Sequence, residues 1–407
     1  MSGEDALTIR IAAIVSLLCL ALPPVLQAQE ATPPSSSGSP ERRDSLPYVN
    51  LYLPEGQASV RLRKLIRNVL FESQIDYKFV TGDISTFLRY KYYAHNFTYK
   101  IAVFDSIGFS GVQSSSLDFE RVRGGLVLFE LPRNYNERYF LLFQDDRLTF
   151  GNSADADNRK NNIYTKIAYQ YGTPFDERMN AIVGESRGRI TPVLTAFREI
   201  GPQKTGIALA LTESARLSTG DYRYTKLEGE ALRRWDLTPT SFMVTRFHLG
   251  TVLGKQDLCG LSTPPPACVG RTIAQVDRYS VPRYEMFKLG GRDALKGVKD
   301  EASRGTDEIH LTNEYFVPVF RNRDFRSWIL HWNTLYGIGY LGVGNVGFSP
   351  SDVVRSRNAV VDAGLGTEAS LTVRDFEVLL SVVVAKPFHA PAELKGKSVR
   401  FSIKTVR

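Results

Sequence analysis

Three glycines in the stretch YLGVGNVGF, residues 340–348, have the spacing of a phosphate-binding loop. Gly342, Gly344 and Gly347 form G-x-G-x-x-G, and Asp362 lies 20 residues after Gly342. In dinucleotide-binding folds such glycines let a pyrophosphate reach the start of a helix, and the acidic residue binds the ribose. Because Ser349 and Pro350 follow, we expect no helix at these glycines. The sequence predicts instead a strand that a loop or backbone approaches closely, and no cofactor.

Other patterns for catalysis are weak. None of the histidines has the H-E-x-x-H spacing of a zinc enzyme. The five are His95, His248, His310, His331 and His389. The segment GESRG, residues 184–188, matches the letters G-x-S-x-G, but that pattern alone is weak evidence for a hydrolase elbow, which also requires a strand-to-helix turn. We therefore predict that the chain is not an enzyme and holds no metal.

Two cysteines outside the N-terminal segment bracket a short Gly/Pro-rich loop. Cys259 and Cys268 enclose GLSTPPPA, and the nearest histidine is His248. Two thiols with no further ligands nearby do not make a zinc site. In an oxidising compartment, two cysteines this close favour a local disulfide.

The N-terminus has the pattern of an export signal. Arg10 precedes an apolar run, residues 11–22, and Ala28 suits the cleavage position. This run is shorter than the roughly 20 residues of a membrane-spanning helix. We assign residues 1–28 to a removed signal peptide and the Pro/Ser-rich residues 29–56 to a flexible linker.

The formal net charge is +8, and the basic residues are scattered along the chain. Nucleic-acid binding would require clustered basic residues, so we predict no nucleic-acid partner. A scattered excess suits a solvated surface or a polar channel, and it is compatible with an anionic membrane surface.

Most of the chain reads as β-strands of roughly 8 to 12 residues separated by turn residues. In residues 75–79, Ile75, Tyr77 and Phe79 alternate with Asp76 and Lys78, and later segments repeat this pattern. A soluble sandwich would explain period-two strands. Strongly ionic alternate positions, abundant Tyr and Phe, and the export signal favour a transmembrane barrel. We predict an all-β, antiparallel outer-membrane β-barrel of about 16 strands over residues 72–407.

One segment has a helical pattern. In residues 57–71 the apolar positions fall on one helical face, and basic residues occupy the remainder. We predict a short amphipathic helix that lies on the membrane surface or packs at the barrel end.

The stretch 284–320 carries the most specific motifs. It resembles the loop-six region of outer-membrane protein insertases and two-partner-secretion transporters, the bacterial surface antigen barrels. Gly290 and Gly291 match the Gly-Gly turn of that family. Leu295, Lys296, Gly297 and Val298 match its Val/Leu-Arg-Gly-Tyr/Phe motif, on a loop folded back into the barrel. Asn313, Glu314, Tyr315 and Pro318 match the strand that follows, and Gly344, Asn345 and Val346 match a later strand ending in Gly-Asn-Val.

Two departures concern the residues that hold the loop. In the family, the motif arginine pairs with an aspartate on a following strand, but here these positions are Lys296 and Gly342. A lysine offers a point charge in place of a planar fork. We consider Glu314 and Asp362 as new partners, and full solvation of Lys296 as the alternative.

The resemblance implies a barrel that transports or inserts polypeptide or lipid at the outer membrane. Family members usually carry periplasmic polypeptide-transport (POTRA) domains, and none fits before the first predicted strand. We therefore expect outer-membrane lipid and lipopolysaccharide as partners, and a separate periplasmic protein for substrate capture. A passive pore or a structural barrel is the alternative.

Overall fold

The structure is a computed structural model, and it describes the greater part of the chain after residue 47. The described residues are 48–53, 57–66, 68–78, 83–94, 97–109, 119–133, 137–150, 159–172, 205–214, 222, 224–254, 281–282, 285–290, 294–298, 304–327, 330–355, 359–373, 376–390, 394 and 398–406. The predicted signal peptide and the predicted Cys259–Cys268 disulfide lie outside these residues.

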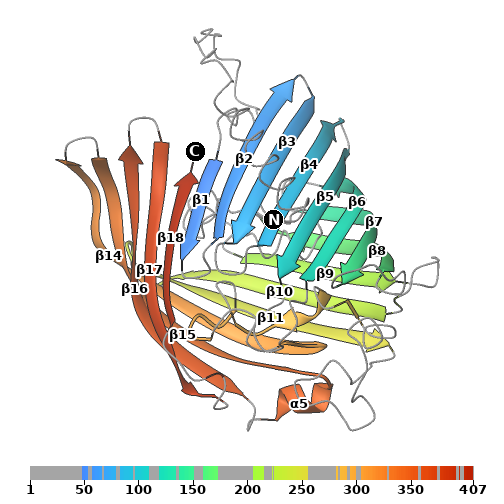
Figure 1. Cartoon of the computed structure of the whole chain (residues 1–407). Coiled ribbons are helices and arrows are strands. Elements are labelled where there is room, and N and C mark those ends of the chain that lie inside the picture. Colours follow the sequence, from blue (N-terminus) through green and yellow to red (C-terminus); the bar gives the residue numbers. More distant parts are fainter. Residues whose placement is uncertain are drawn as a thin grey trace, which may run out of the picture. The chain divides into compact units, whose positions relative to one another are not determined.

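Strands dominate the described residues, and sixteen of them form one antiparallel sheet (Figure 1). Its strands are β1 Tyr48–Leu53, β2 Gln57–Ile66, β3 Val69–Lys78, β4 Asp83–Tyr93, β5 Thr98–Phe109, β6 Phe119–Pro132, β7 Glu137–Phe150, β8 Arg159–Tyr171, β9 Thr205–Ser214, β10 Tyr224–Asp236, β11 Phe242–Gly254, β14 Asp307–Ser327, β15 Leu330–Gly347, β16 Val360–Val373, β17 Phe376–His389 and β18 Ser398–Val406. The prediction of an all-β antiparallel architecture is confirmed. The membrane span and the strand number of the whole chain stay predictions.

Each strand pairs with its neighbours along the chain, except that β11 pairs with β14. The intervening chain contains the short strands β12 Phe287–Lys288 and β13 Arg304–Gly305, which pair with each other. β1 pairs with β18 over Asn50–Leu53 and with β2 over Tyr48–Tyr52. The hydrogen-bonded order therefore returns to its first strand, as in a barrel.

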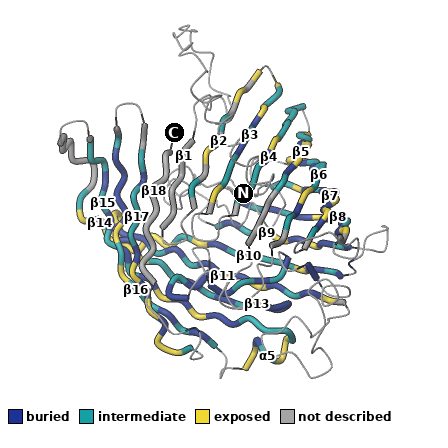
Figure 2. Tube along the Cα trace, viewed as in Figure 1, coloured by how far each residue is buried: buried dark blue, intermediate teal, exposed yellow. Residues whose placement is uncertain are grey.

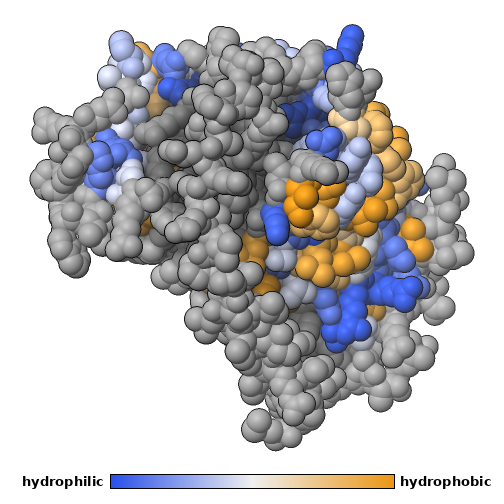
Figure 3. Space-filling model, turned by 90° about the horizontal axis from the view of Figure 1, so that it is seen from above, coloured by the Kyte–Doolittle hydropathy of each residue, from blue (hydrophilic) through white to orange (hydrophobic). Residues whose placement is uncertain are grey.

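The two faces of the sheet differ in polarity, and Figure 2 shows how burial alternates along the strands. In β3, Glu72 and Gln74 are buried, whereas Phe71 and Tyr77 are exposed. In β10, Lys226 is buried and Leu227 is exposed. A soluble sandwich places apolar side chains inside, so this reversal suits a wall with lipid outside and polar groups within. In Figure 3 the described hydrophobic side chains gather in patches on the surface.

The predicted helix over residues 57–71 is wrong, because these residues form β2 and the start of β3. Ile66 pairs with Val69 across a tight turn that contains Asn68. Val60, Leu62 and Ile66 share one face of β2, a period of two that the helical pattern concealed. The predicted linker 29–56 is also wrong over β1, and the sheet begins at Tyr48 rather than at residue 72.

Aromatic rings gather near one end of the strands, beside short connections. Tyr92 and Tyr99 lie 5.4 Å apart between ring centroids near the β4–β5 turn. Tyr139 and Tyr169 lie 5.3 Å apart near the β6–β7 turn. Interfacial girdles of membrane barrels have this composition and position.

The inner face also carries an apolar layer, which includes Phe242, Phe316, Tyr336 and Ile338. The rings of Phe242 and Phe316 stack with centroids 4.8 Å apart. This layer lies toward the β10–β11 turn, and the charged inner residues described below lie further along the same strands. No helix among the described residues is long and apolar enough to cross a membrane.

Candidate functional site

The candidate site is the segment between β11 and β14, which we call loop six, where it lies against the inner wall. Its described residues are 281–282, 285–290, 294–298 and 304–306. Gly290 forms an isolated bridge with Leu295, and the Leu295 N–H donates to the Leu289 carbonyl at 3.0 Å. Leu295 is therefore held against Leu289 and Gly290 by backbone contacts. Gly291, part of the predicted motif, lies outside the described residues.

Loop six packs on the wall where the strands carry glycine. A Cβ atom on Gly342 would lie 2.8 Å from the Leu295 side chain, and one on Gly344 would lie 2.9 Å from that of Leu289. A Cβ atom on Gly250, in β11, would collide with the Phe287 ring. Close packing leaves no room for these extra atoms. The glycines of the apparent nucleotide motif thus lie in β15 and accommodate the loop, as the sequence predicted in outline.

One part of that prediction needs correction, because a helix does follow the glycines. The five-residue helix α5, Pro350–Val354, begins with Ser349 as its N-cap and Pro350 in its first turn. Both residues favour a helix start, so they do not break the chain here as the sequence predicted. Asn345 donates from Nδ2 to the Asp352 and Val353 carbonyls at 2.8 and 2.9 Å. Asn345 therefore holds this helix to the end of β15.

Lys296 reaches an acidic residue on β14. Its Nζ lies 2.8 Å from Glu314 Oε1, and the two side chains are 13% and 17% exposed. The same Nζ lies 5.2 Å from the centroid of the Tyr340 ring. A lysine with an ion pair and an aromatic face is not fully solvated, so the structure favours the paired alternative.

The next residue of the motif reaches a different strand. The Gly297 N–H donates to Asp362 Oδ2 on β16 at 2.6 Å, and the Tyr340 hydroxyl donates to Oδ1 at 3.0 Å. The Lys296 N–H in turn donates to the Tyr340 hydroxyl at 3.1 Å. Asp362 is fully buried, and hydrogen bonds to an ionised acceptor are stronger than neutral ones. Adjacent motif residues therefore contact β14 and β16, the strands on either side of β15.

A third contact anchors loop six to β10. Lys226 Nζ lies 3.4 Å from Glu285 Oε2 and 4.7 Å from the centroid of the Phe287 ring. Lys226 also lies 3.3 Å from Glu228 Oε2. The start of the loop is thus attached to the wall by charge and by an aromatic ring.

Beneath the loop lies a buried cluster of histidine and glutamate that sequence reasoning missed. His248 and His310 face each other across β11 and β14, with ring centroids 5.0 Å apart. His310 Nδ1 lies 2.8 Å from Glu308 Oε1, and His248 Nδ1 lies 3.4 Å from Glu230 Oε2. The Phe287 ring of loop six lies edge-on to His248 at 5.9 Å. Inward parity at these positions was visible in the sequence, but the pairing of β11 with β14 was not.

Among the residues that the structure describes, no group of three or more His, Cys, Asp and Glu side chains is arranged to hold a metal ion. The histidine–glutamate cluster is a buried polar network. Its Glu230 also accepts a hydrogen bond from Arg246.

Solved structures with the same fold are known. The protein is similar to BamA from Haemophilus ducreyi lacking POTRA domains 1-3, with a TM-score of 0.59 and 12% identity over 88% of this chain and 69% of that one. For CdiB from Escherichia coli the TM-score is 0.58 and the sequence identity is 10%, over 88% of this chain and 62% of that one. For CdiB from Acinetobacter baumannii the TM-score is 0.52 and the sequence identity is 9%, over 88% of this chain and 59% of that one.

The chain therefore spans less than two thirds of either CdiB chain. No family model matches the sequence, and neither does any curated protein. The likeness shows the fold, and it confirms the resemblance that the loop motif predicted: this chain has the barrel fold of BamA and CdiB.

Proposed function

We propose that the protein is an outer-membrane barrel of the insertase and secretion type, in which loop six closes the lumen until a substrate displaces it. The observation that carries this proposal is the attachment of adjacent motif residues to two strands, by Lys296 to Glu314 and by Gly297 to Asp362. A barrel of sixteen strands is wide enough to leave an aqueous channel unless something fills it.

The substrate class that we propose is polypeptide or lipid, moved across or into the outer membrane. Support comes from the fold shared with BamA and CdiB and from the retained loop motif. We propose further that the signal peptide, residues 1–28, directs export and is removed. A separate periplasmic protein would then supply the substrate, and outer-membrane lipid and lipopolysaccharide would surround the wall.

Electrical recording tests the proposal. The mature chain and a variant lacking residues 291–306 are folded into planar bilayers, and single-channel conductance is compared. We expect the intact barrel to stay mostly closed and the deletion to conduct steadily, because the deleted segment contains Lys296 and Gly297.

The same recording distinguishes the proposed function from the alternative, a passive pore. If the intact and deleted barrels conduct alike, loop six does not close the lumen, and the proposed function is wrong. A Leu237→Arg variant, altered in the exposed β10–β11 turn, controls for general effects of substitution.

A further inference from the structure

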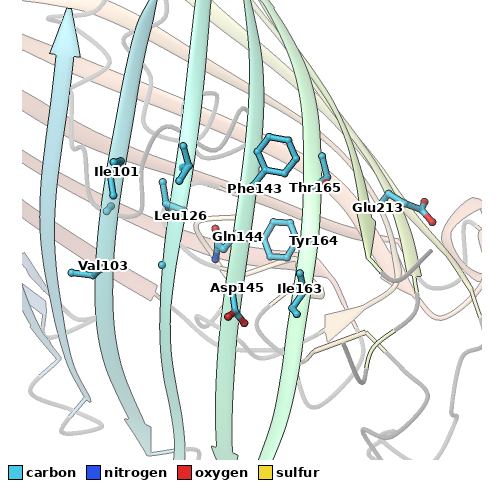
Figure 4. Close-up of a pocket in the computed structure, with 13 residues that line it drawn as sticks. Ile101, Val103, Leu126, Phe143, Gln144, Asp145, Ile163, Tyr164, Thr165 and Glu213 are labelled. Atoms are coloured by element: carbon cyan, nitrogen blue, oxygen red, sulfur yellow. The ribbon is translucent and has the colours of Figure 1, made fainter. Parts of the chain in front are cut away.

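The outer face of the wall carries a groove across β5 to β9, on the side of the sheet opposite to the inner polar groups (Figure 4). Its cavity volume is about 530 Å³, within the range of lipid- or drug-sized sites. Most of its outward lining is apolar, and Thr165 and two acidic residues, Asp145 and Glu213, also line it. The apolar side chains are Ile101, Val103, Val127, Phe143 and Ile163. A surface of this kind suits a hydrocarbon chain.

Gly125 is one of the residues that line the groove, and it has no side chain to fill it. Gly125 pairs with Val103 on one side and with Asp145 on the other. A Cβ atom at Gly125 would lie 3.6 Å from the nearest heavy atom, the Ala102 carbonyl oxygen. Unlike the inner glycines, Gly125 therefore has room for a Cβ atom, which would lie at ordinary van der Waals distances from Ala102 and Val103.

Two arginines lie beside each other next to this space. Arg123 and Arg147 are directly opposite in the register of β6 and β7, and both side chains are exposed. Like charges in opposite positions destabilise a strand pair, so an anion between them would offset the repulsion. Arg123 Nε lies 3.1 Å from Asp105 Oδ2, and Arg121 binds the same carboxylate at 2.9 and 2.6 Å.

Acidic groups offset much of the positive charge near the groove. Asp105 is shared by two arginines, and Asp145 lies two residues before Arg147 on the same face. The three arginines and two aspartates sum to +1, and Glu213, at the β9 side of the groove, brings the sum to zero, so an anion would be held by the arginine pair itself rather than by a net positive charge. No acidic residue is paired with Arg147 among the described residues, so Arg147 is the most available cation of the patch.

The position along the strands places the arginines at a membrane boundary. Arg147 follows Tyr139 by eight positions in β7, about 27 Å along the strand and about 21 Å across the membrane at the usual strand tilt of about 40°. Barrels in outer membranes have an apolar band about 25 Å tall, short periplasmic turns and longer outer loops. Residues 133–136 join β6 to β7 at the Tyr139 end, whereas 110–118 and 151–158 join strands at the Arg147 end. The arginines thus belong to the outer side.

We propose that this wall binds a phosphorylated lipid of the outer leaflet, with an acyl chain in the groove at Gly125 and a phosphate between Arg123 and Arg147. The inference rests on the proposed placement in the outer membrane and names one lipid partner of that barrel. Arginine suits this role because its planar group donates two parallel hydrogen bonds to phosphate oxygens.

Binding is tested with the full chain in detergent micelles, by native mass spectrometry. The probe is a bisphosphorylated, acylated glucosamine disaccharide, compared with its dephosphorylated form and with inorganic pyrophosphate. The double variant Arg123→Gln/Arg147→Gln should weaken binding of the phosphorylated probe by about tenfold or more, the effect of losing charged hydrogen bonds. Arg133→Gln, in the turn at the opposite end, is the matched control and should bind like the unaltered chain.

The variant Gly125→Leu tests the groove separately, because its Cβ would make only ordinary van der Waals contacts and the strand should fold. It should weaken both acylated probes and leave pyrophosphate binding unchanged. The proposal is overturned if the double variant binds the phosphorylated probe normally. It is also overturned if pyrophosphate competes fully and Gly125→Leu has no effect, because the site would then bind only a free anion.

The test of the lipid site is independent of the proposal that loop six closes the lumen. A barrel that inserts into bilayers and closes through loop six, yet fails this binding test, overturns only the lipid site. A chain that fails to insert into bilayers overturns the membrane placement itself.

Discussion

Glycines on the two faces of this wall meet different surroundings. On the inner face, Gly250, Gly342 and Gly344 lie under loop six, where an added Cβ would collide with a loop side chain. On the outer face, Gly125 borders an open groove. The same residue type thus admits a segment of the protein on one face and leaves room for a ligand on the other. The face, rather than the glycine spacing, decides the role.

The largest effect should come from reversing the polarity of the outer face. Ala231 lies near the middle of β10, on the same outward face as the exposed Leu227 and between the buried Glu230 and Leu232. Ala231→Arg should lower the free energy of unfolding by about 2–4 kcal/mol, the cost of a lipid-facing charge near the bilayer midplane. Urea unfolding in phosphatidylcholine vesicles measures this change. Leu237→Arg, in the turn, is the control, and equal effects of both would show that β10 does not face lipid.

Replacing a glycine of the inner face by a larger residue should lower the free energy of unfolding by less than a lipid-facing arginine does. The same replacement on the outer face should lower it least. Gly344→Val would crowd His310 and Leu289, and we expect about 1–3 kcal/mol of destabilisation from overpacking. Gly125→Val should stay within about 0.5 kcal/mol, as surface changes usually do. The same urea unfolding measures both. If Gly344→Val is as mild as Gly125→Val, loop six does not pack on β15.

Removing the charge of Asp362 should loosen loop six without a steric change. Asp362→Asn keeps the shape but weakens the acceptor of the Gly297 N–H and the Tyr340 hydroxyl. We expect the free energy that holds loop six to the wall to fall by about 1.5 kcal/mol, the low end of the range for hydrogen bonds to charged groups. Protease sensitivity of loop six in the folded barrel should rise. Asp145→Asn, on the outer face, should leave that sensitivity unchanged, and an equal rise would contradict the assignment.

Of the two anchors of the loop-six motif, Lys296 should have the smaller effect. Its ion pair with Glu314 is partly exposed, and such pairs contribute about 1 kcal/mol or less. Lys296→Gln should raise the protease sensitivity of loop six slightly, whereas Lys296→Arg should preserve protection because the charge remains. An effect of Lys296→Gln larger than that of Asp362→Asn would reverse the ranking of the two anchors.

Much of the architecture was predictable, because alternation within a strand is a local property. Ile75 and Tyr77 against Asp76 identify β3 without reference to any partner. β2 was harder because Leu62, Leu65 and Ile66 satisfy a helical and a strand period over a short window. Its pairing with β1 and β3 decides the outcome, and pairing is not local.

The candidate site was only partly predictable for the same reason. Glu314 and Asp362 were predicted as candidate partners of Lys296, with full solvation as the alternative, because the family motif places the loop near their strands. The facing pair His248 and His310 depends on the register of β11 with β14, which are separated by all of loop six. The role of Gly342 and Gly344 likewise depends on a loop that folds back onto the strand after it.

Hydrogen exchange of the loop-six peptide that contains residues 294–298 tests the central claim most directly. In the intact barrel the Gly297 amide donates to buried Asp362, so we predict slow exchange that becomes faster in Asp362→Asn but not in Asp145→Asn. Exchange of this peptide at the rate of an unstructured chain in the intact barrel would contradict the account, because loop six would then not be held inside the wall.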